Sequence, residues 1–310
     1  MKSALQIALL VLSLPEAFSW SNERYTYDDY VQYGTHDMII NIAHYRVRDC
    51  DEGAVSYIFD RWGGFLYYTE WPDMGPEELG YPDWENHNYD FYDFGYRGGS
   101  PDRGGPGKVG EVYSQTVENL TVWLKTGSQV YANNASILMS ILSHYLADIT
   151  MPMHTDDTSG GSPEHTGAYL VFPDGKVREH SYHSLYEKAV DWGVKVDYPG
   201  NVTNAVYDIT HSYQPRYIKD IENFVLEVAM ISNGYSEEFM ASDPLGSVVG
   251  SRYWWFVSEV KVCVDMGQSY NSIPGMSEEL YYETIVQLRM AVESMSDTMY
   301  SAWIDANSGF

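Results

Sequence analysis

The stretch His144-Tyr-Leu-Ala-Asp148-Ile-Thr-Met-Pro152-Met-His154 lies near the middle of the chain and decides how the rest is interpreted. His144 and Asp148 are four residues apart, so on a helix they lie one turn apart on the same face. Pro152 cannot continue a helix, and the residue before a proline favours extended backbone. The stretch therefore predicts a helix that ends before Pro152, after which His154 leaves in a new direction.

The polar residues of this stretch are potential metal ligands. Two imidazoles and one carboxylate within eleven residues form a donor set that suits zinc, which binds nitrogen and oxygen ligands. A core helix that carries one buried histidine and one capping aspartate has the same pattern. Taken alone, the stretch leaves both interpretations open.

The first nineteen residues have the features of a secretory signal peptide. Lys2 supplies a positive start, the run Ala4–Leu14 is mostly apolar, and Ala17-Phe18-Ser19 places small residues where a signal peptidase cleaves. The apolar run is too short to cross a bilayer. We expect a signal peptide at 1–19, a single domain at 20–310 that begins at Trp20, and a secreted protein or one in the lumen of a secretory compartment.

Composition narrows the classes of partner. The formal net charge of −26 repels phosphate backbones at long range, which argues against a general nucleic-acid binder but not against a nuclease whose metals meet the phosphate locally. No later segment is long and apolar enough to span a membrane. The sequence gives no indication of oligomeric state.

Two further features concern the secretory pathway. Asn-x-Ser/Thr sequons begin at Asn119, Asn134 and Asn201, which suits a glycoprotein. Cys50 and Cys263 can pair in an oxidising compartment or remain free thiols, and the sequence does not decide between these outcomes.

The spacing of apolar residues predicts a mostly helical chain. The Gly- and Pro-rich segments 71–108 and 155–178 are expected to be loops, and the second contains a possible hairpin through Tyr169 with a Pro-Asp-Gly turn. The predicted helices are 35–48, 53–65, 109–124, 132–148, 181–192, 202–211, 214–233, 245–264 and 277–306.

Five more potential ligands lie outside the central stretch. His36 is early in the first predicted helix, and Asp73 and His87 are fourteen residues apart. His183 and Glu187 form a second i,i+4 pair. Each has an ordinary structural explanation, such as a packed histidine or a pair on a helix surface. Together they add three histidines and two carboxylates on segments that could converge.

In chain order, these residues resemble the zinc-dependent phospholipases C and the related secreted single-strand nucleases, which share a trinuclear zinc fold. The resemblance implies an all-α, single multi-helix domain of that type with three Zn²⁺ ions in a cleft. The matching pieces are Trp20-Ser-Asn-Glu23, Gly34-Thr-His36-Asp-Met-Ile, Asp73 and His87, the stretch from His144 to His154, and His183-Ser-Leu-Tyr-Glu187.

The same resemblance assigns ligands to each ion. It implies that removal of the signal peptide exposes an N-terminal amine that binds metal, and that Asp73 is also the catalytic residue, as a general base or a group that orients water. The implied ligands are, site by site, Asp73, His87, His144 and Asp148; Trp20, His36 and the bridging Asp148; and His154, His183 and Glu187.

The function that we predict first is that of a phospholipase C acting on a zwitterionic phospholipid such as phosphatidylcholine. The sixteen-residue spacing from Trp20 to His36 and the use of Glu187 resemble the phospholipases more than the nucleases. Glu23 and Trp84 match residues that contact the choline group there. A carboxylate and an aromatic face suit a quaternary ammonium. An exposed charge and a packed aromatic ring are the ordinary alternatives for Glu23 and Trp84.

Two other functions fit the same residues. The first alternative is a secreted zinc-dependent single-strand nuclease or 3′-nucleotidase, whose base-binding slots the Tyr- and Trp-rich loops could supply. The second is a non-catalytic glycoprotein that zinc stabilises. The expected partners are a phospholipid headgroup or, in the alternative, single-stranded nucleic acid, and peripheral contact with a membrane is open.

Overall fold

The computed structural model describes residues 34–58, 65–75, 86, 87, 89, 104–155, 168–171, 177–180, 186, 187, 190, 191, 193, 194, 202–235 and 278–308. The predicted signal peptide and the predicted helix over 245–264 lie outside these residues. Cys263 also lies outside them, while Cys50 is exposed and forms no disulfide.

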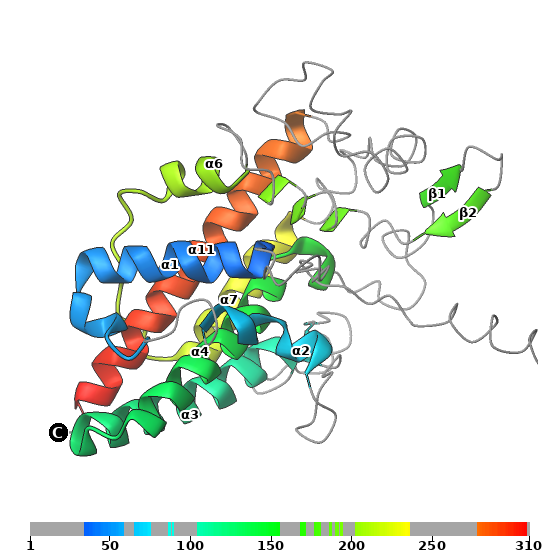
Figure 1. The fold of residues 1–310 in the computed structure, drawn as a ribbon. Helices are drawn as coiled ribbons and strands as arrows, with labels where there is room; N and C mark the ends of the chain where they lie inside the picture. The colour runs from blue at the N-terminus through cyan, green and yellow to red at the C-terminus, as the bar shows by residue number, and fades with distance from the viewer. Residues whose placement is uncertain are drawn as a thin grey trace, which may run out of the picture.

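The described part of the chain is mainly α-helical, which confirms the predicted fold class (Figure 1). One antiparallel pair, β1 (Ala168–Val171) and β2 (Val177–His180), forms the predicted hairpin, with Ala168 opposite His180. The helices are α1 (Thr35–Cys50), α2 (Trp71–Met74), α3 (Gly104–Thr126), α4 (Gln129–Ile149), α6 (Val202–Ile209), α7 (Ile221–Gly234) and α11 (Glu278–Ser308), and the 3-10 helices are η1 (Glu52–Val55), η3 (Leu66–Glu70) and η7 (Pro152–His154).

The end of α4 follows the prediction from the central stretch. The helix ends at Ile149, and Met151, the residue before Pro152, is extended with φ −89° and ψ 121°. The 3-10 helix η7 then carries His154 away from the α4 axis. Pro152 therefore separates His144 and Asp148, which lie on α4, from His154, which lies on η7.

The prediction of a single loop over 71–108 was wrong at both ends, since α2 and the first turn of α3 lie within it. Glycines were taken as loop residues, but Gly105 allows the start of α3 to approach the end of α4. A Cβ at Gly105 would lie 2.4 Å from Ile149 Cδ1. Close packing, and not flexibility, explains this glycine.

Two predicted helices differ from the structure where it describes them. Within the helix predicted over 53–65, the 3-10 helix η1 covers the start and the chain turns at residues 56 and 57, while residues 59–64 lie outside the described part. The helix predicted over 214–233 begins only at Ile221, because residues 213–218 take no helical form and side chains of α11 hold them. The backbone N–H of Arg216 donates to Asp297, and that of Ile218 donates to Ser301.

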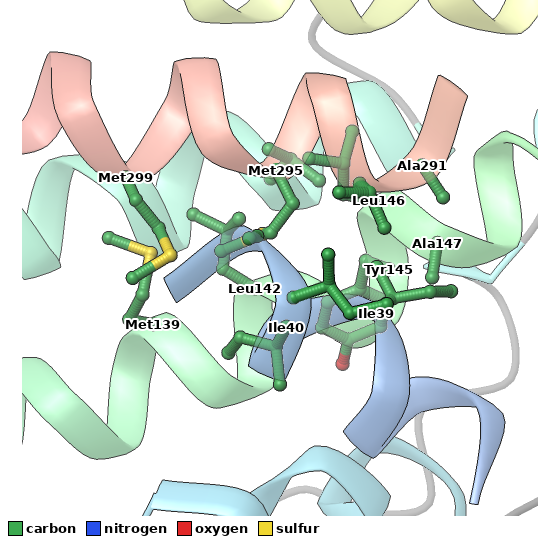
Figure 2. Packing of buried hydrophobic residues seen from close by; sticks show 14 of the residues in the cluster. Ile39, Ile40, Met139, Leu142, Tyr145, Leu146, Ala147, Ala291, Met295 and Met299 are labelled. Carbon is green, nitrogen blue, oxygen red and sulfur yellow. The ribbon is translucent and has the colours of Figure 1, made fainter. Parts of the chain in front are cut away.

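The core lies where α1, α4 and α11 contact one another pairwise. From Met139 to Ile149 every residue of α4 is buried, so this half of the helix is surrounded by protein on all sides. Figure 2 shows Met139 and Leu142 of α4 with Ile39 of α1 and Met299 of α11 in this cluster. The central position of α4 means that His144 and Asp148 are placed in the interior.

Among the described residues, no helix combines the length and apolar character needed to cross a membrane.

Candidate metal centre

The site begins with the i,i+4 pair on α4. His144 and Asp148 are both fully buried, and His144 Nε2 lies 3.3 Å from Asp148 Oδ2. The two side chains therefore share a helix face, as the sequence predicted, and that face looks into the protein. A buried ionisable pair of this kind needs further partners, because taking a carboxylate out of water is costly.

Asp73 and His87 complete a group around this pair. The short helix α2, with Pro72 in its first turn, carries Asp73 to within 3.5 Å of His144 Nε2 through Oδ1. His87 Nδ1 lies 2.7 Å from Asp148 Oδ2 and 3.2 Å from His144 Nε2. The four residues that the resemblance assigned to one zinc ion thus come together from three separate segments of the chain.

His36 approaches the same carboxylate from the other side. It lies in the first turn of α1, with its Nε2 3.6 Å from Asp148 Oδ1. Its ring stacks on that of His144, with centroids 4.0 Å apart and planes 12° from parallel. Asp148 therefore presents Oδ1 to one imidazole and Oδ2 to two others, which is the arrangement expected of a carboxylate shared by two metal sites.

A second, smaller group lies at η7. His154 Nε2 is 3.3 Å from Glu187 Oε1, and both side chains are buried. These are two of the three side chains assigned to the third zinc ion. Trp20, Glu23, Trp84 and His183 lie outside the described residues, so their positions stay predictions.

A hydrogen bond to the backbone fixes the orientation of His144. Its Nδ1 lies 2.6 Å from the carbonyl oxygen of Thr69, and a carbonyl can only accept, so Nδ1 carries the hydrogen. In the neutral ring the lone pair is then on Nε2, which faces Asp73 and Asp148. Histidines that bind metals commonly hold their other nitrogen in this way.

The electrostatics of the group favour a positive charge at its centre. Burial lowers the pKa of His144, but the carboxylates of Asp148 and Asp73 and the Thr69 carbonyl outweigh it and raise the pKa from 6.5 to about 9. Burial and then the neighbouring His144, His87 and His154 lower the pKa of His36 well below 6.5, so His36 is neutral. Neutral imidazoles are the form that binds metal.

The residues present fit zinc. Two groups of potential ligands have all their donor atoms within 4.8 Å of one another, namely His36, His144 and Asp148, and Asp73, His87 and His144. These are buried imidazole nitrogens and carboxylate oxygens, the donors that zinc prefers. A divalent cation would supply the positive charge that the two carboxylates favour, and it would use the Nε2 lone pair that Thr69 directs inward.

Two residues of the site were not found from the sequence. Thr69 acts through its backbone carbonyl, which any residue type could supply, so no sequence signal marks it. Asp37 follows His36 directly, and its Oδ1 accepts a hydrogen bond of 2.8 Å from the Thr69 hydroxyl. An acidic residue in the first turn of a helix is a recognisable capping signal, so the sequence could have predicted the capping role of Asp37.

Comparison with known proteins bears on the fold. No protein-family model matches the chain, and no curated protein does. Among solved structures it is similar to alpha-toxin of Clostridium perfringens, from an avian strain, with a TM-score of 0.50 and 14% identity. The match covers 89% of this chain and 65% of alpha-toxin, so the chain spans about two thirds of that protein.

This likeness concerns the fold. It agrees with the mainly α-helical domain that the resemblance to the zinc-dependent phospholipases C implied. The order of helices places a buried group of histidines and carboxylates at the meeting point of α1, α2 and α4. At 14% identity the match does not extend to substrate, and the activity is argued below from the site.

Proposed function

We propose that this chain is a secreted zinc-dependent phosphodiester hydrolase, and that it is a phospholipase C acting on a zwitterionic phospholipid such as phosphatidylcholine. The observation that carries the proposal is the placement of Asp148, whose two oxygens face two groups of potential ligands in a buried site. A fold shared with alpha-toxin adds support at the level of architecture.

The proposed ligands follow the sequence assignment. Those among the described residues lie in two places, around Asp148 and around the His154–Glu187 pair. When bound, zinc would neutralise phosphate oxygens and make a water acidic enough to supply hydroxide near neutral pH. The three proposed sites are Asp73, His87, His144 and Asp148; the amine and carbonyl oxygen of Trp20 with His36 and Asp148; and His154, His183 and Glu187.

Asp73 is the proposed general base. Its side chain is 9% exposed, whereas those of His144 and Asp148 are fully buried. It is thus the member of the group closest to solvent, where a water and a substrate phosphate would enter. His144 Nε2 and His87 Nδ1 lie 3.5 and 3.7 Å from its Oδ1, so two imidazoles orient the carboxylate that would accept a proton from water.

The substrate proposal rests on charge and on Glu23 and Trp84. A net charge of −26 favours a zwitterionic headgroup over a polyanion. The carboxylate of Glu23 and the ring of Trp84 would form a cage for the choline ammonium. Removal of residues 1–19 would free the Trp20 amine, which ties activity to passage through the secretory pathway.

The test is a pair of assays on the purified mature protein. Phosphatidylcholine vesicles and single-stranded DNA are each incubated with the protein, with a chelator, and with the chelator followed by zinc. We expect hydrolysis of the lipid that the chelator abolishes and zinc restores. The variant His154→Ala should lose metal and activity, and His211→Ala, which changes an exposed histidine of the segment after α6, should lose neither.

Other outcomes would overturn the proposal. Zinc-dependent hydrolysis of DNA without hydrolysis of the lipid would make the chain a nuclease. Zinc that raises the melting temperature with neither activity would make it a metal-stabilised glycoprotein.

A further inference from the structure

A chain of hydrogen bonds runs from α1 through η3 to His144. The Asp37 carboxylate accepts from the Thr69 hydroxyl at 2.8 Å, and the Thr69 carbonyl accepts from His144 Nδ1 at 2.6 Å. Asp37, Thr69 and His144 are almost fully buried. Burial keeps these bonds away from bulk solvent, and in a low-dielectric interior such a chain is strong only when all its members are satisfied.

Asp37 also fixes the start of α1. Its Oδ2 accepts the backbone N–H of Gly34 at 3.1 Å, which is the capping arrangement of a residue in the first turn. His36 lies one residue before it in the same turn. One carboxylate therefore holds both the turn that carries His36 and the residue that orients His144.

Thr69 has the corresponding role on the segment formed by η3 and α2. It is buried in η3, four residues before Asp73, and α2 follows η3 without a break. The Thr69 hydroxyl also contacts the Leu66 carbonyl at 2.8 Å. The position of its own carbonyl, and so the ring orientation of His144, depends on how η3 is held against α1.

We infer that Asp37 and Thr69 are positioning residues that set the geometry of the two potential ligand groups together. Asp37 links His36 of one group to His144, which belongs to both. This inference deepens the proposed function and rests on it. Neither residue contacts the reacting atoms. Loss of the link should loosen His36 and His144 at once, and so weaken binding of zinc without removing a ligand.

The test measures zinc affinity by competition with a chelator on the mature protein. The variant Thr69→Val removes the hydroxyl and keeps the shape and the carbonyl, and we expect zinc to bind about 10- to 100-fold more weakly. Thr69→Ser keeps the hydroxyl and should stay near the unchanged protein. Thr116→Val is the matched control, since Thr116 is also buried and its hydroxyl donates within α3, to the Val112 carbonyl.

A second pair of variants keeps the inference testable if Thr69→Val fails to fold. Asp37→Asn should weaken zinc binding by a similar factor. The double variant should lose no more than the stronger single one, because both changes break the same link. Equal affinity in Thr69→Val, Thr116→Val and the unchanged protein would overturn the inference. An unchanged protein that binds no zinc would instead refute the proposed function.

Discussion

Two buried carboxylates of this protein have opposite surroundings. Asp148 on α4 and Asp297 on α11 are both almost completely buried. Asp297 accepts from the Tyr213 hydroxyl at 2.7 Å, from the Arg216 backbone N–H at 2.7 Å and from Arg216 Nη2 at 3.0 Å. All three are donors in every state of charge near neutral pH, so the carboxylate is satisfied by the protein alone.

Asp148 is surrounded by imidazoles instead. Among the described residues, the side-chain nitrogens near it belong to His36, His87 and His144, at 3.6, 2.7 and 3.3 Å. Burial keeps His36 neutral, and a neutral imidazole has one N–H donor and one nitrogen lone pair that can bind a cation. A cation shared among these atoms would satisfy them all.

The difference separates a carboxylate that holds structure from one that is available for chemistry. Asp297 and Asp305 of α11 both fix residues 213–218, and Asp305 does so by accepting from the Tyr217 hydroxyl at 2.8 Å. Asp305 also accepts from the hydroxyl of Tyr113, a residue of α3, at 2.7 Å. Both carboxylates meet uncharged hydroxyls, and Asp297 also meets an arginine. The partners of Asp148 are histidines, which can change their protonation or bind metal. Burial at Asp148 therefore suits a metal site, whereas burial at Asp297 suits a structural contact.

The largest predicted effect is at Asp148. Asp148→Asn keeps the shape but removes the charge that two ligand groups share. We expect loss of bound metal, measured by elemental analysis, and a fall in phosphodiesterase activity of more than about 100-fold. This is more than the loss of about 10- to 100-fold expected when a residue that only supports a metal ligand is changed. Retention of full metal content in this variant would show that Asp148 is a structural carboxylate like Asp297.

Asp297→Asn should give the reverse pattern. The asparagine amide has one oxygen that accepts, and its NH₂ group would face the N–H and O–H donors that now bind the second carboxylate oxygen. We therefore expect the free energy of unfolding to fall by about 1–3 kcal/mol. Metal content should not change, because the residue is not among the potential ligands. Denaturant unfolding monitored by circular dichroism measures the first quantity, and a metal count on the folded protein measures the second.

Arg216 should matter less than Asp297. Its side chain is 69% exposed, so water screens its ion pair with the aspartate. We expect Arg216→Met to lower the free energy of unfolding by less than about 1 kcal/mol, since the backbone N–H of residue 216 still donates to Asp297. A loss as large as that in Asp297→Asn would mean that the guanidinium, and not the hydroxyl and backbone donors, holds the segment.

The two regions also differ in what the sequence could predict. His144 and Asp148 were predicted as neighbours because helical periodicity fixes an i,i+4 pair. The backbone preferences of a proline and of the residue before it predicted that the helix ends before Pro152, and α4 ends at Ile149. The Asp297–Arg216 contact was not predicted, because its partners are 81 residues apart and neither has a local pattern that indicates the other.

Errors in the helix boundaries have the same origin. The segment before Ile221 has apolar residues at helical spacing, yet it is non-helical because α11 supplies partners for its backbone N–H groups. Contacts between distant segments override local propensity there. At the metal centre, the side chains could be recognised by their types, whereas the Thr69 carbonyl could be found only from the structure.

The last prediction concerns the pH dependence of the contact between Tyr213 and α11, in which the Tyr213 hydroxyl donates to Asp297. Burial, and then the hydrogen bond and charge of Asp297, raise the pKa of Tyr213 above its ordinary value of 10.0. In the unfolded chain this tyrosine loses its proton near pH 10, while in the folded protein it keeps it. The stability that it contributes is therefore fully present below about pH 10 and falls as the pH rises further.

The variant Tyr213→Phe should be slightly less stable at pH 7, by about 1 kcal/mol for one lost hydrogen bond. The difference from the unchanged protein should shrink above pH 10, because the variant has no proton to lose at this position. Thermal unfolding between pH 8 and pH 11 measures it. In the same scan, the difference in stability between Asp148→Asn and the unchanged protein should stay constant with pH, because Asp148 lies at the metal centre and not beside Tyr213. If that difference also became smaller above about pH 10, the two regions would not titrate separately.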